Sequence, residues 1–344
     1  MKRNNLNITK IEPLLSPLEL KTQLPLSKKA SGAVAVYRQT INNIMNRKDK
    51  RFLIIVGPCS IHSPNEAIEY ASRLASLSKV VQDKMMLIMR VYFEKPRTTT
   101  GWKGLIYDPD LNESYNMAKG LYSARELLLK IDEIGLPTAT EILDPVTAQY
   151  ITDLISWAAI GARTTESQTH RQLASGLSMP VGFKNTTDGS IKTAIEAIQS
   201  AMHKHAFLGL LEDGRSGIFH TKGNKYSHIV LRGGSNGPNY SSEFVAYTRE
   251  LLKKLNITPN IIIDCSHANS NKEALKQKTV LLDVIKQKKA GEQSIIGVML
   301  ESNLLFGKQT VKEGEKPKCG ISITDECLGW EETEKLLKEI YALL

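Results

Sequence analysis

The sequence contains little cysteine and no long hydrophobic stretch. Four cysteines occur in 344 residues, and their positions give neither a C-x-x-C pair nor a regular framework. This excludes a disulfide scaffold and favours a reducing compartment. No apolar run approaches the roughly 20 residues that span a bilayer, and the basic N-terminus continues into Asn4, Asn5 and Asn7 instead of an apolar signal core. We therefore expect a cytoplasmic protein with no membrane partner.

Two further absences narrow the function. No G-x-G-x-x-G follows the first apolar run, which argues against dinucleotide binding. The net charge is +9, but the lysines are spread along the chain, and no tract of lysine and arginine is interleaved with aromatic residues. Nucleic acid is therefore disfavoured as a partner. Excess positive charge fits anionic ligands, so phosphorylated small molecules are the favoured class, with a basic surface that only aids solubility as the alternative.

From residue 51 onward, short apolar runs alternate with longer helical stretches. Eight runs separated by amphipathic segments predict parallel β/α units, and the number eight favours a closed (β/α)8 TIM barrel over an open sheet. The runs are 52–56, 86–92, 138–143, 158–162, 181–183, 206–211, 261–264 and 295–300. Residues 1–48 then form an N-terminal extension, and residues 49–344 form the barrel.

Smaller signals add detail to this fold. Ser16 and Ser63 each precede a proline and stand three residues before a glutamate, which predicts helix starts, as does Asp144 before a proline. The segments 213–220 and 225–231 are short and alternating, with glycine between them. They predict a β-hairpin inserted near the sixth strand.

Basic side chains follow many of the predicted strands. Because the carboxyl ends of the strands meet on one face of a β/α barrel, we expect these cations to converge there. They are Arg90, Lys95, Arg97, Arg163, Lys184 and Arg232. One such residue is usually only a solvated loop charge. Six at one mouth repel one another and need anions, and arginine presents a planar fork that matches phosphate or carboxylate. Two or more anionic groups fit this much charge.

A second set of strand-end residues has the chemistry of a metal site. It comprises Cys59, His267, Glu301 and Asp325. Each alone reads equally well as a core thiol, a loop histidine or a surface carboxylate, and no short ligand spacing supports a metal. The first and eighth strands are neighbours in a closed barrel, however, which brings the set together. One thiolate, one imidazole and two carboxylates accept Mn²⁺, Fe²⁺, Co²⁺ or Zn²⁺.

Several long motifs resemble one known family, the 3-deoxy-D-arabino-heptulosonate 7-phosphate synthases of type I, in their microbial, feedback-regulated branch. The motifs are GPCSIH at 57–62, RVYFEKPRTT at 90–99, GARTTES at 161–167, GFKN at 182–185, LRGG at 231–234 and DCSHANS at 264–270. The resemblance covers the chain from about residue 10 to its end. Ser63 and Thr186 depart from the usual aspartate and glycine of the family, and we expect little effect from either.

This resemblance implies an activity and assigns roles to residues. Phosphoenolpyruvate and erythrose 4-phosphate would condense with water in the first step of the shikimate pathway. The phosphoenolpyruvate site would be Arg90, Lys95, Arg163, Lys184 and Arg232, and the erythrose 4-phosphate site Lys95, Pro96, Arg97, Thr98 and Thr99. Cys59, His267, Glu301 and Asp325 would hold one divalent metal ion. Lys95, Lys184 and Glu141 are the candidate catalytic residues, with Lys184 and Glu141 handling protons around the water.

The resemblance also implies regulation. In this family an N-terminal extension builds subunit contacts and an effector pocket for an aromatic amino acid. We expect a homodimer or homotetramer with a pocket formed by Asp144, Gln149, Leu177, Ser178 and Gly209. Family members that respond to phenylalanine tend to carry serine near the end of strand six, and those that respond to tyrosine carry glycine. Gly209 therefore predicts tyrosine as the effector.

Three other functions stay open at this point. A related synthase acting on a different aldose phosphate is the nearest, although the KPRTT motif at 95–99 favours the four-carbon sugar. A class II aldolase-like barrel is disfavoured, because the metal set includes a thiolate and two carboxylates instead of a histidine cluster. A basic nucleic-acid-binding protein would show salt-dependent binding to any duplex, but it gives no reason for cations to fall at strand ends.

Overall fold

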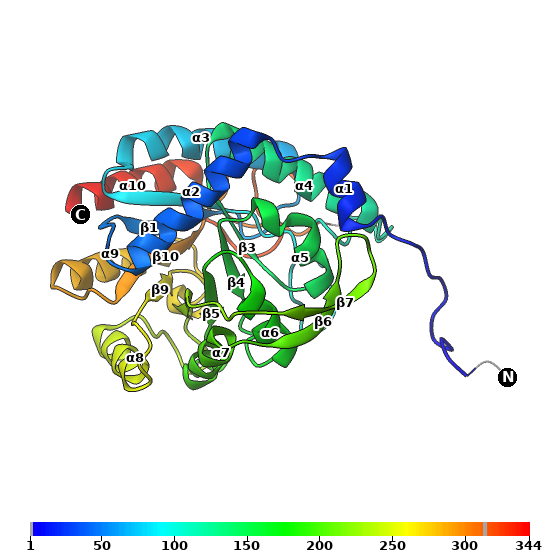
Figure 1. Cartoon of the computed structure of the whole chain (residues 1–344). Coiled ribbons are helices and arrows are strands. Elements are labelled where there is room, and N and C mark those ends of the chain that lie inside the picture. Colours follow the sequence, from blue (N-terminus) through cyan, green and yellow to red (C-terminus); the bar gives the residue numbers. More distant parts are fainter. Residues whose placement is uncertain (1–2, 312–314) are drawn as a thin grey trace.

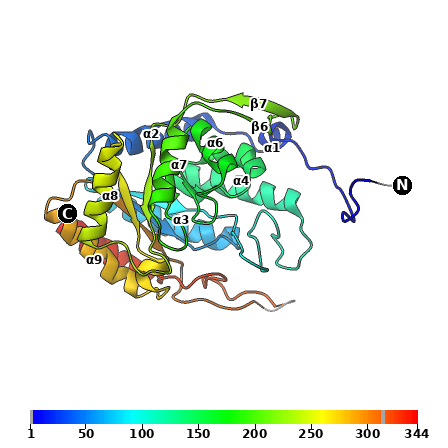
Figure 2. The same cartoon turned by 90° about the horizontal axis from the view of Figure 1, so that it is seen from below.

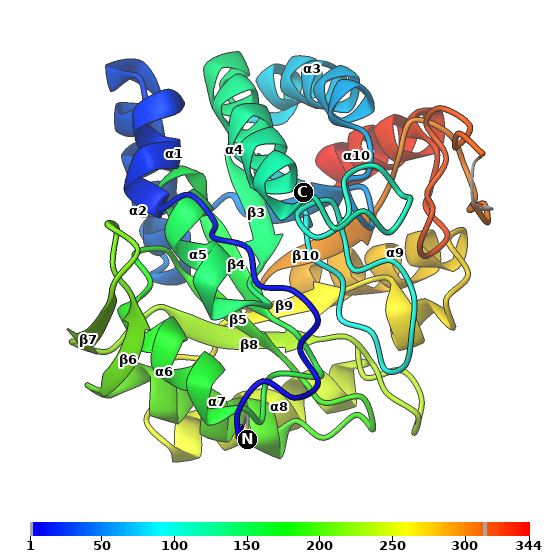
Figure 3. The same ribbon diagram turned by 90° about the vertical axis from the view of Figure 1, so that its right-hand side faces the viewer.

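The computed structural model describes residues 3–311 and 315–344, and its centre is a closed barrel of eight parallel strands in the order β1-β10-β9-β8-β5-β4-β3-β2. The barrel strands are β1 (Phe52–Gly57), β2 (Met85–Arg90), β3 (Thr138–Glu141), β4 (Trp157–Ile160), β5 (Val181–Lys184), β8 (Ser227–Leu231), β9 (Ile261–Asp264) and β10 (Ile295–Glu301). Figure 3 shows barrel strands such as β3, β4, β5 and β8 at the centre with helices around them. The predicted (β/α)8 fold is confirmed.

Helices cover the outside of the barrel, as amphipathic segments between buried strands require. They are α3 (Pro64–Val81), α4 (Met117–Ile134), α5 (Pro145–Ile151), α6 (Gln168–Gly176), α7 (Lys192–Met202), α8 (Ser242–Lys254), α9 (Lys276–Lys289) and α10 (Trp330–Leu343), with short 3-10 turns η1 (Thr152–Leu154) and η2 (His267–Ser270). The predicted caps are present: the side chains of Ser16, Ser63 and Asp144 accept backbone N–H groups of the helices that follow them.

The side chains of the barrel strands belong to two buried clusters, because successive side chains of a strand point to opposite faces. One cluster joins residues such as Ile54 to the surrounding helices. The other contains alternate residues such as Leu53 and Trp157, and it also includes Ile41 and Met45 of α2 (Lys28–Met45). The second helix of the N-terminal extension therefore packs against the side chains that fill the interior of the barrel.

The hairpin near the sixth strand exists, but its predicted strands were wrong. The run 206–211, predicted as the sixth barrel strand, forms β6 (Ala206–Leu210) and pairs antiparallel with β7 (Ser216–His220) outside the barrel. The segment 225–231, assigned to the hairpin, supplies barrel strand β8. β8 is buried throughout although it contains Ser227 and His228, whereas alternate side chains of the more apolar β6, such as Leu208, face outward. Burial on both faces is the property that selects a strand for a parallel barrel.

The hairpin lies beside α1 (Pro17–Gln23) in both views of Figures 1 and 2. The Leu18 N–H donates to the Glu212 carbonyl at 2.7 Å, and Lys21 Nζ lies 2.7 Å from Glu212 Oε1. The chain before α1 extends away from the barrel, and Leu6 and Ile11 on this arm are exposed. Within the described residues, every helix is too short or too polar to cross a membrane.

Candidate active site

The carboxyl ends of the barrel strands surround a cavity of about 150 Å³. All six cations predicted to converge line it, namely Arg90, Lys95, Arg97, Arg163, Lys184 and Arg232. The same wall includes Pro96, Glu141, His267, Glu301 and Asp325. Thr98 and Thr99 lie beyond this lining, but the Arg163 Nε donates to Thr98 Oγ1 at 3.2 Å. The prediction that strand ends bring these charges together is confirmed.

Arg90 ends β2 and is fully buried. Its Nη2 donates to Glu301 Oε1 at 3.0 Å, and its guanidinium carbon lies 4.0 Å from the centre of the Tyr92 ring. Its Nη1 is buried without a hydrogen-bond partner. Buried arginine nitrogens are normally paired, so this free donor on a cavity wall is suited to an anionic ligand.

Lys184 ends β5 between two buried carboxylates. Its Nζ lies 3.6 Å from Glu141 Oε2 and 3.5 Å from Asp264 Oδ2. Burial alone would lower the pKa of Lys184, but the neighbouring Tyr92 hydroxyl, Asp264 and Glu141 together raise it above the ordinary lysine value. Lys184 is therefore a cation at neutral pH. It can donate a hydrogen bond or a proton, but it does not serve as a base.

Glu141 ends β3 and faces the following strand. A Cβ atom added to Gly161 would collide with Glu141 Oε1. The absence of a side chain at residue 161, directly after β4, therefore leaves the space that this carboxylate occupies.

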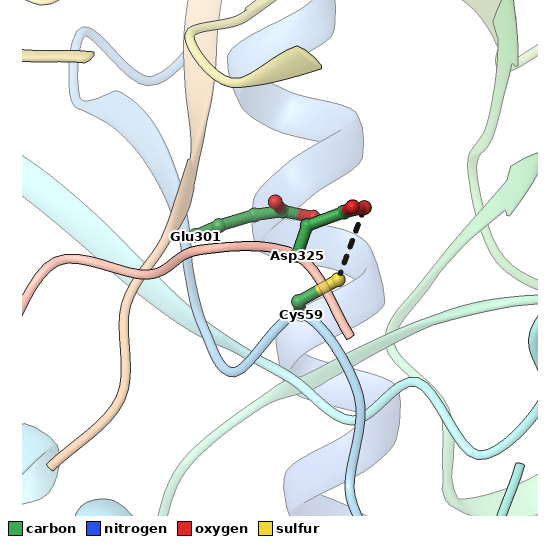
Figure 4. Close-up of side chains that lie close together, drawn as sticks. All are labelled: Cys59, Glu301 and Asp325. Atoms are coloured by element: carbon green, nitrogen blue, oxygen red, sulfur yellow. Dashed lines mark hydrogen bonds between the residues drawn. The ribbon is translucent and has the colours of Figure 1, made fainter. Parts of the chain in front are cut away.

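Cys59, Glu301 and Asp325 form a group suited to a metal ion. Their Sγ and carboxylate atoms all lie within 4.8 Å of one another, and Figure 4 shows the three side chains together. Cys59 and Glu301 meet because β1 and β10 are paired with Gly57 opposite Glu301. Asp325 comes from the segment after β10, and its Oδ2 lies 3.6 Å from Cys59 Sγ.

His267, the fourth predicted ligand, does not belong to that compact group, but it lies beside it. Its Nε2 is 3.9 Å from Glu301 Oε1, and its Nδ1 lies 2.7 Å from Ser266 Oγ and 3.0 Å from Asp264 Oδ2. A carboxylate on the second ring nitrogen is the arrangement that orients metal-binding histidines. His267 has a φ of 57°, a left-handed conformation that is uncommon outside glycine and concentrates at functional sites.

The electrostatics of the group fit a divalent cation. Burial, followed by the Glu301 carboxylate, raises the pKa of Cys59 to about 11. Burial would also raise the pKa of Asp325, but Lys95 and His267 lower it below its ordinary value. Lys95 Nζ donates to Cys59 Sγ at 3.1 Å. A thiol and two carboxylates this close repel one another as anions, and a cation among them removes that repulsion.

Sequence reasoning missed three residues of this site. Asp264 is fully buried between His267 and Lys184, and its place three residues before His267 at a strand end could have identified it. Tyr92 stands against Arg90 and Lys184. Lys272 lines the cavity, but it lies beyond η2 and is turned back by a φ of 62°, which no strand-end pattern indicates.

A second cavity, of about 770 Å³, lies between the extension, the hairpin and the barrel helices. Gln149, Leu177 and Ser178 line it, as the predicted effector pocket requires. Asp144 and Gly209 are not part of its lining. Asp144 caps α5 and accepts the Tyr107 hydroxyl at 2.8 Å.

Gly209 lies beside the wall of this second cavity, next to the rings of Phe207 and Phe219 that line it. It pairs with Gly217 in the hairpin. A Cβ added to Gly209 would lie 2.9 Å from the ring of Phe219, which lines the cavity. The glycine therefore fixes where that ring can lie.

The four cysteines are all free in the structure, and Cys59 and Cys327 are both buried. Cys327 Sγ lies 3.6 Å from the Asp325 carbonyl oxygen, so it stands beside the metal group. We predict that apo-protein stored in air forms a disulfide between Cys59 and Cys327, because no metal then occupies the Cys59 sulfur and oxygen can oxidise the pair. Titration of free thiols should fall by two per chain relative to metal-loaded protein. An unchanged thiol count would contradict this.

A closed β/α barrel with a cationic cavity beside a thiol–carboxylate group is the architecture of metal-dependent barrel enzymes that bind anionic substrates. The chain belongs to the DAHP synthetase I family, whose sequence profile it matches over residues 23–338. This confirms the resemblance that the motifs gave.

Relatives and a solved structure agree with that family. The chain is 51% identical to the Phe-sensitive phospho-2-dehydro-3-deoxyheptonate aldolase of Escherichia coli K12, over 98% of this chain and 97% of the relative. It is 49% identical to the Tyr-sensitive protein of the same strain, over 98% and 95%. A solved phospho-2-dehydro-3-deoxyheptonate aldolase from Francisella tularensis SCHU S4 superposes with a TM-score of 0.95 at 48% identity, over 98% of both chains.

Proposed function

We propose that this protein condenses phosphoenolpyruvate with erythrose 4-phosphate and water to give 3-deoxy-D-arabino-heptulosonate 7-phosphate and phosphate. This is the reaction of the DAHP synthetase I family to which the chain belongs, the first step of the shikimate pathway. The observation that carries it is the single cavity in which six cations lie beside the Cys59, Glu301 and Asp325 group. The two substrates together bring two phosphates and one carboxylate to that positive charge.

The phosphoenolpyruvate site consists of Arg90, Lys95, Arg163, Lys184 and Arg232. The unpaired Nη1 of buried Arg90 and the cationic Lys184 supply donors at the base of the cavity. Arg163 is exposed and Arg232 is only partly buried. Their guanidinium groups can each donate two parallel hydrogen bonds to a phosphate or carboxylate. Holding the enol ester at several points fixes the face that its C3 presents, which is an orientation effect on rate.

The erythrose 4-phosphate site consists of Lys95, Pro96, Arg97, Thr98 and Thr99, directly after β2. Arg97 binds the phosphate of the sugar in this proposal. Its Nε donates to the Trp102 carbonyl at 2.8 Å, which leaves the terminal guanidinium nitrogens free for an anion. The contact of Arg163 with Thr98 joins the two substrate sites.

One divalent ion, Mn²⁺, Fe²⁺, Co²⁺ or Zn²⁺, completes the site, held by Cys59, His267, Glu301 and Asp325. When bound, it supplies Lewis-acid polarisation of the aldehyde oxygen. Lys95 Nζ, 3.2 Å from the Cys59 carbonyl and 3.1 Å from its sulfur, stands between the ligand group and the sugar segment. It can therefore donate to the same aldehyde.

The reaction then follows from the electronics of phosphoenolpyruvate. C3 attacks the aldehyde carbon, positive charge develops at C2, and water adds at C2. The product of that addition loses phosphate. Lys184 holds a proton beside this centre, and Glu141, 3.6 Å from Lys184, is placed to accept one from the water. Oxygen-18 water should therefore label the new ketone and leave the released phosphate unlabelled, as measured by mass spectrometry. Label in the phosphate would contradict cleavage of the carbon–oxygen bond.

The activity itself has a direct test. Loss of the ultraviolet absorbance of phosphoenolpyruvate is followed with and without erythrose 4-phosphate, then with a chelator, then with Mn²⁺ restored. We expect loss that needs the aldose, stops with the chelator and returns with the metal. No loss with any of the four metals would overturn the assignment and direct the assay to other aldose phosphates.

Tyrosine is the proposed effector, bound in the 770 Å³ cavity that Gln149, Leu177 and Ser178 line. Identity does not decide the effector, since the Phe-sensitive and Tyr-sensitive relatives are 51% and 49% identical to this chain. Gly209 favours tyrosine, because a side chain there would displace Phe219 and reduce the space for a phenol. The extension, residues 1–48, is proposed to build this pocket and the contacts of a homodimer or homotetramer. The cytoplasmic location stays a prediction.

We predict that tyrosine inhibits the enzyme and that Gly209→Ser raises the tyrosine concentration for half-inhibition about tenfold or more, the scale on which a misfitting group is rejected from a pocket. Activity without effector should be unchanged. Gly32→Ser, in α2 where no atom lies within 4 Å of the added Cβ, is the control. Inhibition of the wild type by phenylalanine and not by tyrosine would contradict the proposal.

A further inference from the structure

Asp325 differs from the other members of the metal group in how it is held. Cys59 and Glu301 are 0% and 2% exposed; Glu301 ends strand β10, and Cys59 follows the end of strand β1 by two residues. Asp325 is exposed and lies in the long segment between β10 and α10, outside any helix or strand. Its position opposite Cys59 therefore depends on the contacts that fasten this segment.

One contact joins the two ligand-bearing segments directly. The hydroxyl oxygens of Ser60 and Thr324 lie 2.9 Å apart. Ser60 follows Cys59 in the chain and is 1% exposed, and Thr324 precedes Asp325. A single hydroxyl–hydroxyl hydrogen bond thus links positions that are each one residue from a ligand. The Thr324 N–H also donates to Ser322 Oγ at 3.2 Å, which fixes the turn from which its side chain projects.

A second tether comes from the same part of the chain. The Gly320 N–H donates to Glu66 Oε2 at 2.9 Å, and Glu66 lies in the first turn of α3. The β1–α3 connection, which carries Cys59, and the first turn of α3 therefore each hold the Asp325 segment by one hydrogen bond. On the other side, Glu326 Oε2 accepts the Ala274 N–H at 2.8 Å. Of these contacts, the Ser60–Thr324 bond is the nearest to both ligands.

We propose that Ser60 and Thr324 are positioning residues whose hydrogen bond sets Asp325 opposite Cys59 and so determines the affinity for the divalent ion. The proposal rests on the metal site assigned above. Neither hydroxyl is a ligand. Backbone hydrogen bonds at Cys327 and Leu328 already hold the chain after Asp325, and the hydroxyl bond holds the chain before it. Without the hydroxyl bond, the carboxylate must be ordered on that side when the metal binds, whereas an anchored carboxylate is already in place. Contacts of this supporting kind are typically worth about 10- to 100-fold in metal affinity.

Binding of Co²⁺ to apo-protein tests this without turnover, because coordination of a cysteine thiolate gives Co²⁺ a charge-transfer absorption band. Thr324→Val removes the hydroxyl at nearly constant shape, and Thr324→Ser keeps it. We expect Thr324→Val to weaken Co²⁺ binding about 10- to 100-fold and Thr324→Ser to bind like the wild type. Ser60→Ala should match Thr324→Val, and the double variant should be no weaker than either, since both changes break the same bond.

Thr248→Val is the matched control. Thr248 is a fully buried threonine of α8 whose hydroxyl donates to the Phe244 carbonyl, and its removal should leave Co²⁺ binding unchanged. Hydrogen exchange at 319–328 should rise in Thr324→Val and not in Thr248→Val. Affinity of Thr324→Val within twofold of the wild type, or additive losses in the double variant, would overturn the proposal while leaving the metal site intact. Failure of the wild type to bind Co²⁺ would overturn the metal site and this inference together.

Discussion

Replacing Cys59 by alanine is expected to lower kcat/KM about a thousandfold and to abolish stoichiometric metal binding. Cys59 is one of three side chains whose ligand atoms lie within 4.8 Å of one another. Without its sulfur, only His267, Glu301 and Asp325 of the proposed ligands remain, and divalent ions that prefer sulfur lose their soft ligand. The loss of rate corresponds to about 4 kcal/mol of transition-state stabilisation, within the several kcal/mol that Lewis-acid catalysis contributes. Steady-state kinetics and elemental analysis of the purified variant measure both effects.

Cys265→Ala provides the matched control for this prediction. Cys265 is also fully buried and directly follows a barrel strand, but its Sγ lies 3.9 Å from the Ile263 carbonyl and outside the metal group. We expect it to keep its metal and most of its activity. If Cys59→Ala retained one metal per chain with near-normal kcat/KM, the ligand assignment would be wrong.

The fold could be predicted from the sequence wherever the pattern is local. Strand β9 was placed with its correct bounds, and the caps at Ser16 and Ser63 are present as expected. The hairpin could not be assigned correctly, because segment 206–211 is the more apolar of the two in sequence, whereas segment 227–231 contains Ser227 and His228. What separates them is whether both faces are covered in three dimensions. Tertiary burial overrides local strand propensity in such a case.

The candidate site divides in the same way. Residues at strand ends, such as Arg90 and Lys184, were predictable because barrel topology alone brings them together. Lys272 was not, because its place on the cavity wall depends on a left-handed turn after η2. The effector pocket was only partly predictable, since its wall combines the extension, the hairpin and barrel helices. Such a surface has no signature in any one segment.

Replacing Lys184 by methionine is expected to cost both activity and stability. The side chain is 4% exposed and lies between Glu141 and Asp264. Methionine keeps the packing but leaves two buried carboxylates without their shared cation, which destabilises by about 3–5 kcal/mol in comparable cases. Phosphoenolpyruvate should also lose an anchor at the base of the cavity. Urea unfolding and calorimetric binding of phosphoenolpyruvate measure the two effects separately.

The two effects of this substitution can be separated by a second change. Lys192→Met is the control, because its side chain is 84% exposed and pairs with Glu196 at 3.9 Å. It should change the free energy of unfolding by less than about 1 kcal/mol. Adding Glu141→Gln to Lys184→Met removes one unpaired carboxylate, so stability should recover in part while phosphoenolpyruvate binding stays lost. Recovery of both would mean that Lys184 only stabilises the barrel. Recovery of stability alone would mean that its charge acts on the substrate.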